Sequence, residues 1–282
     1  MNKTGRPFIG CDSDYAPSNI ILFGAPFDGT ASFRKGARFA PAQMRKNCGD
    51  GIETYSPYQR KDLADILVCD IGDVSLGTKN TSDVLDEIEK ATACIVQDGK
   101  LPVMIGGEHL VTLGAVRALV KAVPDLHVIH LDAHADLRDE MLGDPLSHAT
   151  VMRRIWDIVG DGRIFQFGIR SGERAELQWG KTHVNTHFFN CNGIDIALKK
   201  IAGKPVYLSI DLDVLDSSVL PGTGTPEAGG IMFGDLVDAI VDTSGGAIVG
   251  ADLVELSPHC DPGGASTLAA CKALRELLLS LQ

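Results

Sequence analysis

The sequence predicts an α/β fold in which helices cover both faces of a largely parallel sheet. Short apolar runs alternate with amphipathic stretches along all 282 residues, which is typical of such folds. Many of these runs are apolar at consecutive positions, as expected for strands that are buried on both faces. The sequence also has no long linker, low-complexity tract or repeat, so we expect a single domain over residues 1–282.

Eight short runs have the length and apolar character of strands. They span residues 19–24, 65–71, 102–106, 127–132, 163–167, 183–189, 205–211 and 247–253. From their number and alternation alone, an open parallel sheet and a closed (β/α)8 barrel fit equally well. In both architectures, polar residues that a core cannot explain are expected at the carboxyl ends of the strands.

Amphipathic segments between these runs predict eight helices. They span residues 41–47, 82–97, 110–122, 147–159, 174–180, 194–201, 233–242 and 265–281. In the last segment, four leucines recur at helical spacing and form an apolar stripe, at positions 274, 277, 278 and 281.

The chain is acidic, since 37 Asp and Glu residues against 26 Lys and Arg residues give a formal net charge of −11. This balance disfavours binding to nucleic acid or anionic lipid, and no apolar stretch approaches the roughly 18 residues of a membrane-spanning helix. We therefore expect neither a nucleic-acid partner nor a membrane partner. The seven cysteines form no Cys-x-x-Cys pattern, and their odd number disfavours a disulfide framework, so we expect a cytoplasmic location.

Three clusters of polar residues follow predicted strands. In the first, an apolar run ends in Gly106 and Gly107, and Glu108 and His109 come next. Glycines allow a tight turn and a close approach of the backbone to a site. Taken alone, this cluster is equally typical of an ordinary loop.

The second cluster holds Asp132, His134 and Asp136. At spacings of two, these side chains point the same way on an extended backbone. A strand edge that faces water would also carry polar residues, but the run up to Leu131 is apolar. Two carboxylates and an imidazole at a buried strand end are costly to desolvate, and a bound cation removes that cost.

The third cluster follows the run 205–211. Asp211 and Asp213 share one side of the chain, whereas Asp216 is offset and is predicted to cap the next turn. Four carboxylates and two imidazoles exceed what one tetrahedral zinc ion requires. We therefore predict two divalent ions, with manganese favoured by the oxygen-rich set, bound by His109, Asp132, His134, Asp136, Asp211 and Asp213. Two such ions activate water for hydrolysis near neutral pH.

Glu255 follows the last predicted strand and is flanked by apolar Val254 and Leu256. It could be an ordinary surface carboxylate, but its neighbours favour burial. A buried carboxylate that binds no metal suits a planar cation, because it pairs bidentately with a guanidinium group.

These residues lie in motifs that resemble the ureohydrolase superfamily of arginases and agmatinases. The runs Gly-Gly-Glu-His at 106–109, Asp-Ala-His-Ala-Asp at 132–136 and Ser-Ile-Asp-Leu-Asp-Val-Leu-Asp at 209–216 look like its three metal-binding signatures, in the same order. The likeness covers nearly the whole chain, since four further segments are similar to agmatinase motifs, namely 24–29, 34–39, 168–172 and 221–226.

The resemblance implies a single three-layer α/β/α domain with an eight-stranded parallel sheet, not a barrel. It also implies two Mn²⁺ ions per subunit and assembly into homotrimers or homohexamers. One ion would bind His109, Asp132, Asp136 and Asp211, and the other Asp132, His134, Asp211 and Asp213. Glu255 matches the residue that binds guanidinium, and Asp136 would accept a hydrogen bond from the attacking hydroxide.

His148 matches the motif histidine that passes protons in this superfamily. Ser147 is a predicted N-cap for the helix over 147–159. This would place His148 in the first helical turn, where the helix dipole disfavours the imidazolium form. A neutral imidazole can accept and pass protons near neutral pH.

The segment 142–150 bears on the substrate. Arginases carry a Ser-Gly-Asn-x-His-Gly loop that reads the α-amino and α-carboxylate groups of arginine, and this chain keeps only the histidine of that pattern, His148. The resemblance is therefore closer to agmatinases, which implies hydrolysis of agmatine, a small cationic guanidino compound, to urea and putrescine in polyamine biosynthesis. Asp144 is a candidate for binding the distal ammonium group, although it could equally cap a turn.

Other functions stay open at this stage. Guanidinobutyrate, guanidinopropionate and arginine are alternative substrates. A metal-dependent amide hydrolase of deacetylase type would need only one zinc ion and would leave His134, Asp213 and Glu255 without a purpose. A non-catalytic, metal-stabilised binding protein would gain nothing from an open nucleophile site.

Overall fold

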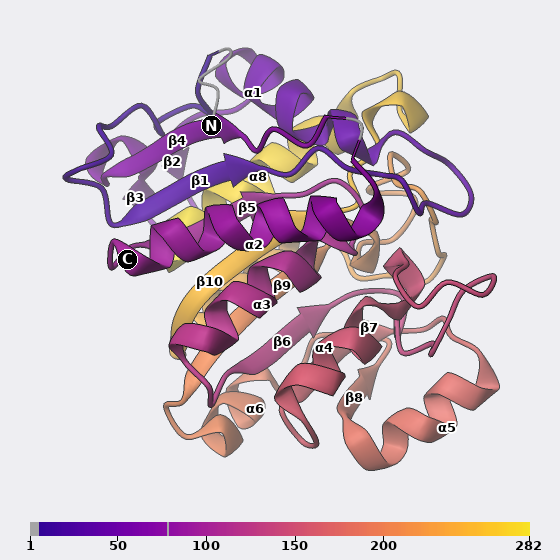
Figure 1. Ribbon diagram of the computed structural model, residues 1–282. Coiled ribbons are helices and arrows are strands. Elements are labelled where there is room, and N and C mark those ends of the chain that lie inside the picture. Colours follow the sequence, from indigo (N-terminus) through magenta and orange to yellow (C-terminus); the bar gives the residue numbers. More distant parts are fainter. Residues whose placement is uncertain (1–5, 78) are drawn as a thin grey trace.

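The computed structural model describes residues 6–77 and 79–282, so residues 1–5 and 78 of the predicted domain lie outside the described part. Its largest element is a sheet of eight strands in the order β4-β1-β5-β10-β9-β6-β7-β8 (Figure 1). The strands are β1 Ile20–Gly24, β4 Val68–Asp73, β5 Leu101–Ile105, β6 His127–Leu131, β7 Ile164–Ile169, β8 Asn185–Phe188, β9 Pro205–Asp211 and β10 Ala247–Val254. All neighbouring strands pair in parallel.

The predicted α/β class and the eight-stranded parallel sheet are confirmed. The sheet is open, with β4 and β8 as its two edges, so the barrel alternative is wrong. Repeat count alone could not separate the two architectures, because closure depends on which distant strands pair.

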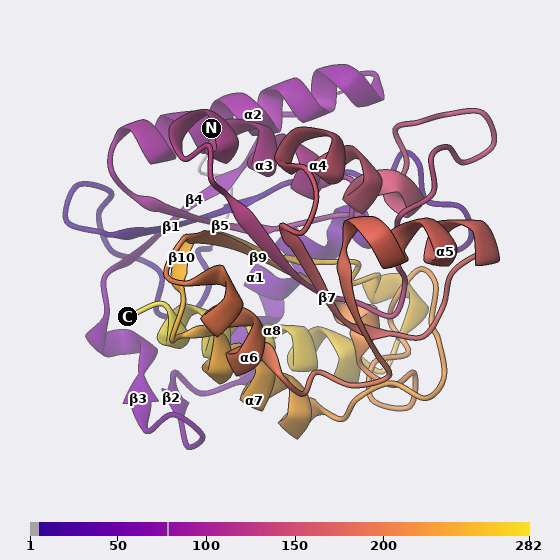
Figure 2. The same ribbon diagram turned by 90° about the horizontal axis from the view of Figure 1, so that it is seen from below.

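Helices cover both faces of the sheet and complete a three-layer arrangement (Figure 2). They are α1 Ala40–Gly51, α2 Thr81–Gln97, α3 Val111–Ala122, α4 Val151–Val159, α5 Arg174–His183, α6 Ile194–Ile201, α7 Phe233–Thr243 and α8 Ala265–Ser280. One apolar core lies beneath α1, α6, α7 and α8. A second core lies on the opposite face beneath α2, α3 and α4, and α5 extends that layer through Trp179, which packs edge-on against Trp156 of α4.

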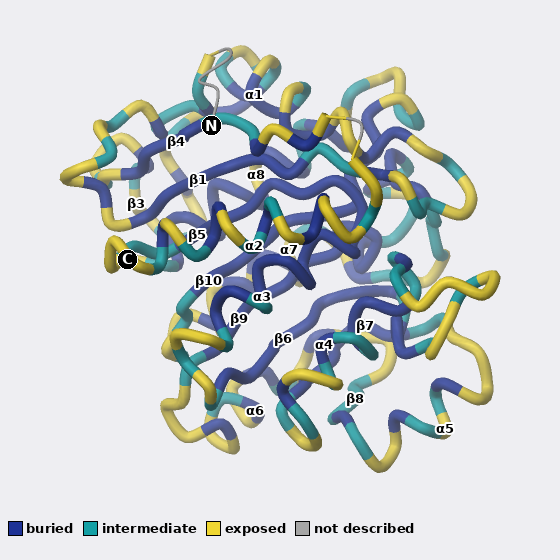
Figure 3. The backbone as a smooth tube through the Cα atoms, viewed as in Figure 1, coloured by how far each residue is buried: buried dark blue, intermediate teal, exposed yellow. Residues whose placement is uncertain are grey.

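Strand β1 shows why consecutive apolar residues predicted buried strands. Ile20 and Leu22 belong to one core, whereas Ile21 and Phe23 belong to the other. Alternate side chains of a strand point to opposite faces, so both faces must be apolar when helices cover both. Figure 3 shows the same pattern, with β1 and β6 buried along their length and exposed residues on the outer sides of the helices.

Two local features differ from the prediction. A hairpin of β2 Tyr55–Ser56 and β3 Lys61–Asp62 was not predicted, because strands of two residues show no periodic pattern. The predicted helix over 147–159 is divided into a 3-10 turn, His148–Thr150, and the α-helix α4 that begins at Val151. Within the described residues, none of the helices is both long enough and apolar enough to cross a membrane.

Candidate metal centre and active site

The candidate site lies at the carboxyl ends of the four central strands. His109 follows β5, Glu255 follows β10, Asp211 is the last residue of β9, and Asp132 follows β6. These strands are neighbours in the order β5-β10-β9-β6, although β5 and β6 are consecutive along the chain. The chain adds β6, β7 and β8 on one side of β5 and then reverses its direction, so that β9 and β10 fill the gap between β5 and β6. Such a switch point leaves a crevice above the strand ends, where ligands bind in open α/β sheets.

Gly107 allows the backbone to pack closely at the carboxyl ends of these strands. A Cβ atom at this position would lie 1.8 Å from the carbonyl oxygen of Phe27. The carbonyl of Gly107 accepts a hydrogen bond of 2.9 Å from the backbone N–H of Glu255. The close backbone approach that the two glycines predicted therefore holds His109 and Glu255 together.

His109 is surrounded by carboxylates. Its Nδ1 lies 3.0 Å from Asp132 Oδ2, 3.1 Å from Asp211 Oδ2 and 3.3 Å from Asp136 Oδ2. The imidazole is buried, and within the described residues this Nδ1 has no partner at hydrogen-bonding geometry. Three carboxylate oxygens and one imidazole nitrogen thus converge on a single point, as the donor set of a cation does.

The other nitrogen of His109 is fixed by a buried chain of hydroxyl groups. Its Nε2 lies 2.9 Å from Ser209 Oγ, and Ser209 Oγ donates to Asp252 Oδ1 at 2.7 Å. Tyr207 and Thr112 donate to the other oxygen of Asp252, both at 2.7 Å. Because the Ser209 proton goes to Asp252, Ser209 accepts the proton of His109 Nε2. The lone pair of Nδ1 is therefore directed at the three carboxylates. Histidines that bind metal typically have their other ring nitrogen held by a hydrogen bond in this way.

His134 forms the centre of a second group. Its Nδ1 lies 2.9 Å from Asp213 Oδ2 and 3.6 Å from Asp132 Oδ1. Asp132 therefore turns one oxygen toward His109 and the other toward His134, as a carboxylate shared by two ions would. For Asp211, the second predicted bridging residue, one oxygen faces His109 and the other accepts the backbone N–H of Asp213 at 2.8 Å.

The cluster has a strong preference for positive charge. Burial raises the pKa of Asp211, and the charges of Asp213 and Asp132 raise it further. Burial alone would lower the pKa of His109, but its interactions with Asp132, Asp136 and Asp211 outweigh burial, so that this pKa lies well above its usual value. Metal ions compete with protons for these same atoms.

His130 is a further residue of the cluster, and the sequence prediction missed it. Ligand atoms lie within 4.8 Å of one another in two groups that share Asp132: one of His109, His130, Asp132 and Asp136, and one of Asp132, His134 and Asp213. The described residues thus fit two neighbouring cations. A histidine in the middle of an apolar strand is more typical of a core, and no signal in the sequence separated the two roles.

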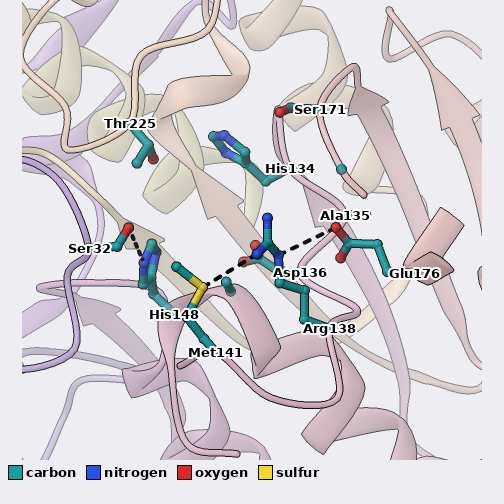
Figure 4. Close-up of a pocket in the computed structure, with 12 residues that line it drawn as sticks. Ser32, His134, Ala135, Asp136, Arg138, Met141, His148, Ser171, Glu176 and Thr225 are labelled. Carbon is teal, nitrogen blue, oxygen red and sulfur yellow. Dashed lines mark hydrogen bonds and ion pairs between the residues drawn. The ribbon is translucent and has the colours of Figure 1, made fainter. Parts of the chain in front are cut away.

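A cavity of about 170 Å³ opens beside His134 and Asp136 (Figure 4). Its inner wall also includes His148, Ser32 and Thr225. The backbone of Asp136 has φ +53°, a conformation that non-glycine residues rarely adopt. Such strained positions gather at functional sites.

His148 is positioned at this cavity by a loop distant in sequence. Its backbone N–H donates to Thr30 Oγ1, and its Nε2 lies 3.0 Å from Ser32 Oγ. Thr30 Oγ1 in turn donates to the buried carboxylate of Glu108 at 2.6 Å. Thr30 and Ser32 lie between the two N-terminal motif segments, 24–29 and 34–39, to which the sequence prediction assigned no role.

The predicted neutral form of His148 is supported, although for a different reason. Ser147 caps the turn as predicted, but His148 lies in a 3-10 turn before α4 rather than in the first turn of an α-helix. Burial is the main cause that lowers the pKa of its imidazole, and the charges of His134 and His109 add to the effect.

We expect His148→Phe to lower kcat about 100-fold, because a well-placed acid–base group contributes about 10²–10⁴ in rate. The ring shape is kept, so bound metal and KM should change little. Since the lowered pKa keeps His148 neutral above about pH 6.5, the ratio of wild-type to variant kcat should stay constant from about pH 6.5 upward. Urea release measured against pH tests this, and a kcat within threefold of wild type (a change of about 0.65 kcal/mol) would remove the assigned role.

Glu255 is a buried carboxylate with only 4% of its surface exposed. Its Oε1 accepts the backbone N–H of His109 at 2.7 Å, and its own backbone has φ +65°. Burial raises its pKa well above the usual value, and the nearby charge of Glu108 adds to this. Within the described residues no cationic side chain pairs with Glu255, and Glu255 itself does not line the cavity beside His134 and Asp136.

Two acidic residues outside the cluster have local roles. Asp144 is exposed and accepts the backbone N–H of Leu146 at 2.8 Å, so it caps its own turn, and it does not line the cavity. Asp216 accepts the backbone N–H groups of Ser218, Gly229 and Gly230, which agrees with the predicted capping role.

Known proteins share both the sequence and the fold. The model of the arginase family matches residues 18–280. An agmatinase from Bacillus anthracis is 42% identical over 280 residues, which is 98% of this chain and 96% of that protein. A guanidinobutyrase from Pseudomonas aeruginosa is 35% identical over 98% of this chain and 90% of its own length. A crystal structure from Clostridium difficile aligns with a TM-score of 0.92 and 49% identity, covering 95% of this chain and 98% of that one.

Proposed function

This chain belongs to the arginase family, and on that premise we propose that it hydrolyses the guanidinium group of agmatine to urea and putrescine. The observation that carries the proposal is Glu255, a buried carboxylate without a cationic partner among the described residues, next to two groups of metal-type ligands. A guanidinium group satisfies both oxygens of such a carboxylate. Agmatine carries this group, and the agmatinase of Bacillus anthracis is 42% identical.

The donor set supports two metal ions, and we assign them to Mn²⁺ because carboxylate-rich sites suit manganese. His109, Asp132, Asp136 and Asp211 would hold one ion, and Asp132, His134, Asp211 and Asp213 the other. Ions bound there supply a water molecule activated near neutral pH.

Residues of the chain would carry out substrate binding, orientation of the water and proton transfer. Glu255 binds the guanidinium group and orients its carbon toward the metal ligands. Asp136 lines the cavity and accepts a hydrogen bond from the attacking water. When the C–N bond to the alkyl chain breaks, the leaving amine needs a proton, and neutral His148, which lines the same cavity, would take one up from the attacking water and pass it on.

The wall of the cavity around Arg138 favours a cationic tail on the substrate. Arg138 lines it, but its guanidinium lies 3.0 Å from Glu173 Oε1 and 3.7 Å from Glu176 Oε1. Two carboxylates outnumber this one guanidinium, so a substrate carboxylate would meet a net negative wall. Agmatine, with its distal ammonium group, is therefore favoured over guanidinobutyrate, guanidinopropionate and arginine.

We also propose a cytoplasmic enzyme that folds as one domain over 1–282 and assembles as a homotrimer or homohexamer. The cysteine spacing supports the location. Assembly of this kind is common among arginase-family proteins. Light scattering of the purified protein measures the subunit number directly.

The substrate is tested by urea release from purified, Mn²⁺-loaded protein with agmatine, guanidinobutyrate, guanidinopropionate and arginine, together with metal analysis of the same sample. We expect kcat/KM for agmatine to exceed the others at least about tenfold, a difference of about 1.4 kcal/mol. Preference for guanidinobutyrate would overturn the substrate assignment. A single zinc ion with amide hydrolysis would support the deacetylase alternative, and stabilisation by Mn²⁺ without turnover would support the binding protein.

A further inference from the structure

His130 lies on β6, two residues before Asp132, and is completely buried. Its Nε2 lies 2.7 Å from Asp132 Oδ2, and its Nδ1 lies 3.1 Å from Gln166 Nε2 on the neighbouring strand β7. Its ring packs against that of His109 at 5.0 Å between centroids. Distance alone would make His130 a second imidazole ligand for the ion beside His109.

The orientation of Gln166 decides between a ligand and another role. Its Nε2 lies 2.7 Å from the carbonyl oxygen of Ala135, and its Oε1 accepts a hydrogen bond of 3.1 Å from Thr186 Oγ1. A carbonyl only accepts hydrogen bonds, so the atom facing Ala135 must be the amide nitrogen. The same nitrogen faces His130 and can only donate to it.

The protonation of His130 follows from this contact. Nδ1 accepts from Gln166 and therefore carries no proton, so the proton of the neutral ring is on Nε2. Nε2 donates to Asp132 Oδ2, which is also the oxygen 3.0 Å from His109 Nδ1. Both nitrogens of His130 are thereby used, and neither lone pair is available to a metal ion.

Asp132 is held from two sides. Its Oδ2 accepts from His130, and its Oδ1 accepts the backbone N–H of His134 at 2.6 Å. These two contacts fix the plane of the carboxylate, so that one oxygen faces His109 and the other faces His134. The orientation that a shared ligand requires is therefore set in part by His130, whose ring nitrogens are both engaged in other contacts.

We propose that His130 is a positioning residue, oriented by Gln166, that holds the carboxylate of Asp132 in the geometry for two metal ions. This inference rests on the metal centre proposed above. Partners of this kind are worth about 10–100-fold in metal affinity when they are removed.

Mn²⁺ titrations of the full-length apoprotein, followed by the electron paramagnetic resonance signal of free Mn²⁺, test the proposal. His130→Leu removes the donor and should weaken Mn²⁺ binding about 10–100-fold, with two ions still bound at saturation. His130→Gln places an amide N–H near Nε2 and should restore most of the affinity. Gln166→Met removes the amide that orients His130. It lies one contact further from the ions than His130 does, and its loss should also weaken Mn²⁺ binding.

Thr186→Val is the matched control, because Thr186 lies at the far end of the chain of hydrogen bonds. In this variant the affinity for Mn²⁺ should change less than about twofold. Thermal unfolding of each apoprotein identifies variants that fail to fold, and Gln166→Met and His130→Gln then carry the test. Loss of one ion at saturation in His130→Leu would make His130 a ligand and overturn the proposal. Unchanged affinity in folded His130→Leu or Gln166→Met would reduce both residues to core packing. If the wild type itself binds no Mn²⁺, the metal centre of the proposed function fails instead.

Discussion

Replacing Asp132 with asparagine is expected to abolish urea release, with a loss of at least about 1,000-fold in kcat/KM. Asp132 presents one oxygen to His109 and the other to His134, so it is the residue common to both ligand groups. Asparagine has nearly the same shape but no charge, and its nitrogen cannot bind a cation. Metal ions contribute several kcal/mol to such hydrolyses, and about 4 kcal/mol corresponds to 1,000-fold in rate.

Metal analysis and urea release on the same sample measure this effect. Asp144→Asn is the matched control, because Asp144 is exposed and caps its own turn through an oxygen that asparagine retains. That variant should bind two ions and keep its activity within about twofold of wild type, the usual range for surface substitutions. Full activity in Asp132→Asn with two bound ions would contradict the assignment of Asp132 as a shared ligand.

Spacing along single strands predicted most of the candidate metal cluster. Asp132, His134 and Asp136 follow buried β6 at intervals of two, and Asp211 and Asp213 have the same spacing at the end of buried β9. Such a pattern within one segment is visible in the sequence. The sequence does not show in the same way that the segments after β5, β6, β9 and β10 lie side by side in the fold. It depends on β10 and β9 lying between β5 and β6, and strand order is decided by pairing between distant parts of the chain.

Residues whose role depends on a distant partner were predicted poorly. His130 sits in an apolar strand, and only its contacts with Gln166 and Asp132 distinguish it from a core residue. Similarly, the contacts of His148 with Thr30 and Ser32 join segments more than 100 residues apart. No local pattern encodes these contacts, so the sequence predicts the neutral form of His148 from a helix dipole, whereas burial is the main cause in the structure.

Substitution of Glu255 by glutamine should lower kcat/KM for agmatine about 100- to 1,000-fold and leave the bound metal unchanged. In the proposed role, Glu255 would bind the guanidinium group through its charge and its two acceptor oxygens, and glutamine removes the charge and one acceptor. Truncating one partner of a buried charge pair costs about 2–5 kcal/mol, or roughly 30- to 5,000-fold. The remaining amide oxygen can still accept the backbone N–H of His109, so the strained backbone at φ +65° keeps its contact.

Steady-state kinetics with metal analysis separate this role from a structural one. If Glu255 recognises the guanidinium group, Glu255→Gln keeps two ions and its thermal stability, and it loses activity toward every guanidino substrate alike. Glu140→Gln, an exposed carboxylate on the loop after Asp136, is the matched control and should behave as wild type. Loss of metal in Glu255→Gln would instead show that Glu255 acts through His109, whose backbone it contacts. Unchanged kcat/KM would mean that the substrate cation binds elsewhere, because a buried carboxylate that binds the reacting group cannot lose its charge without a large effect on rate.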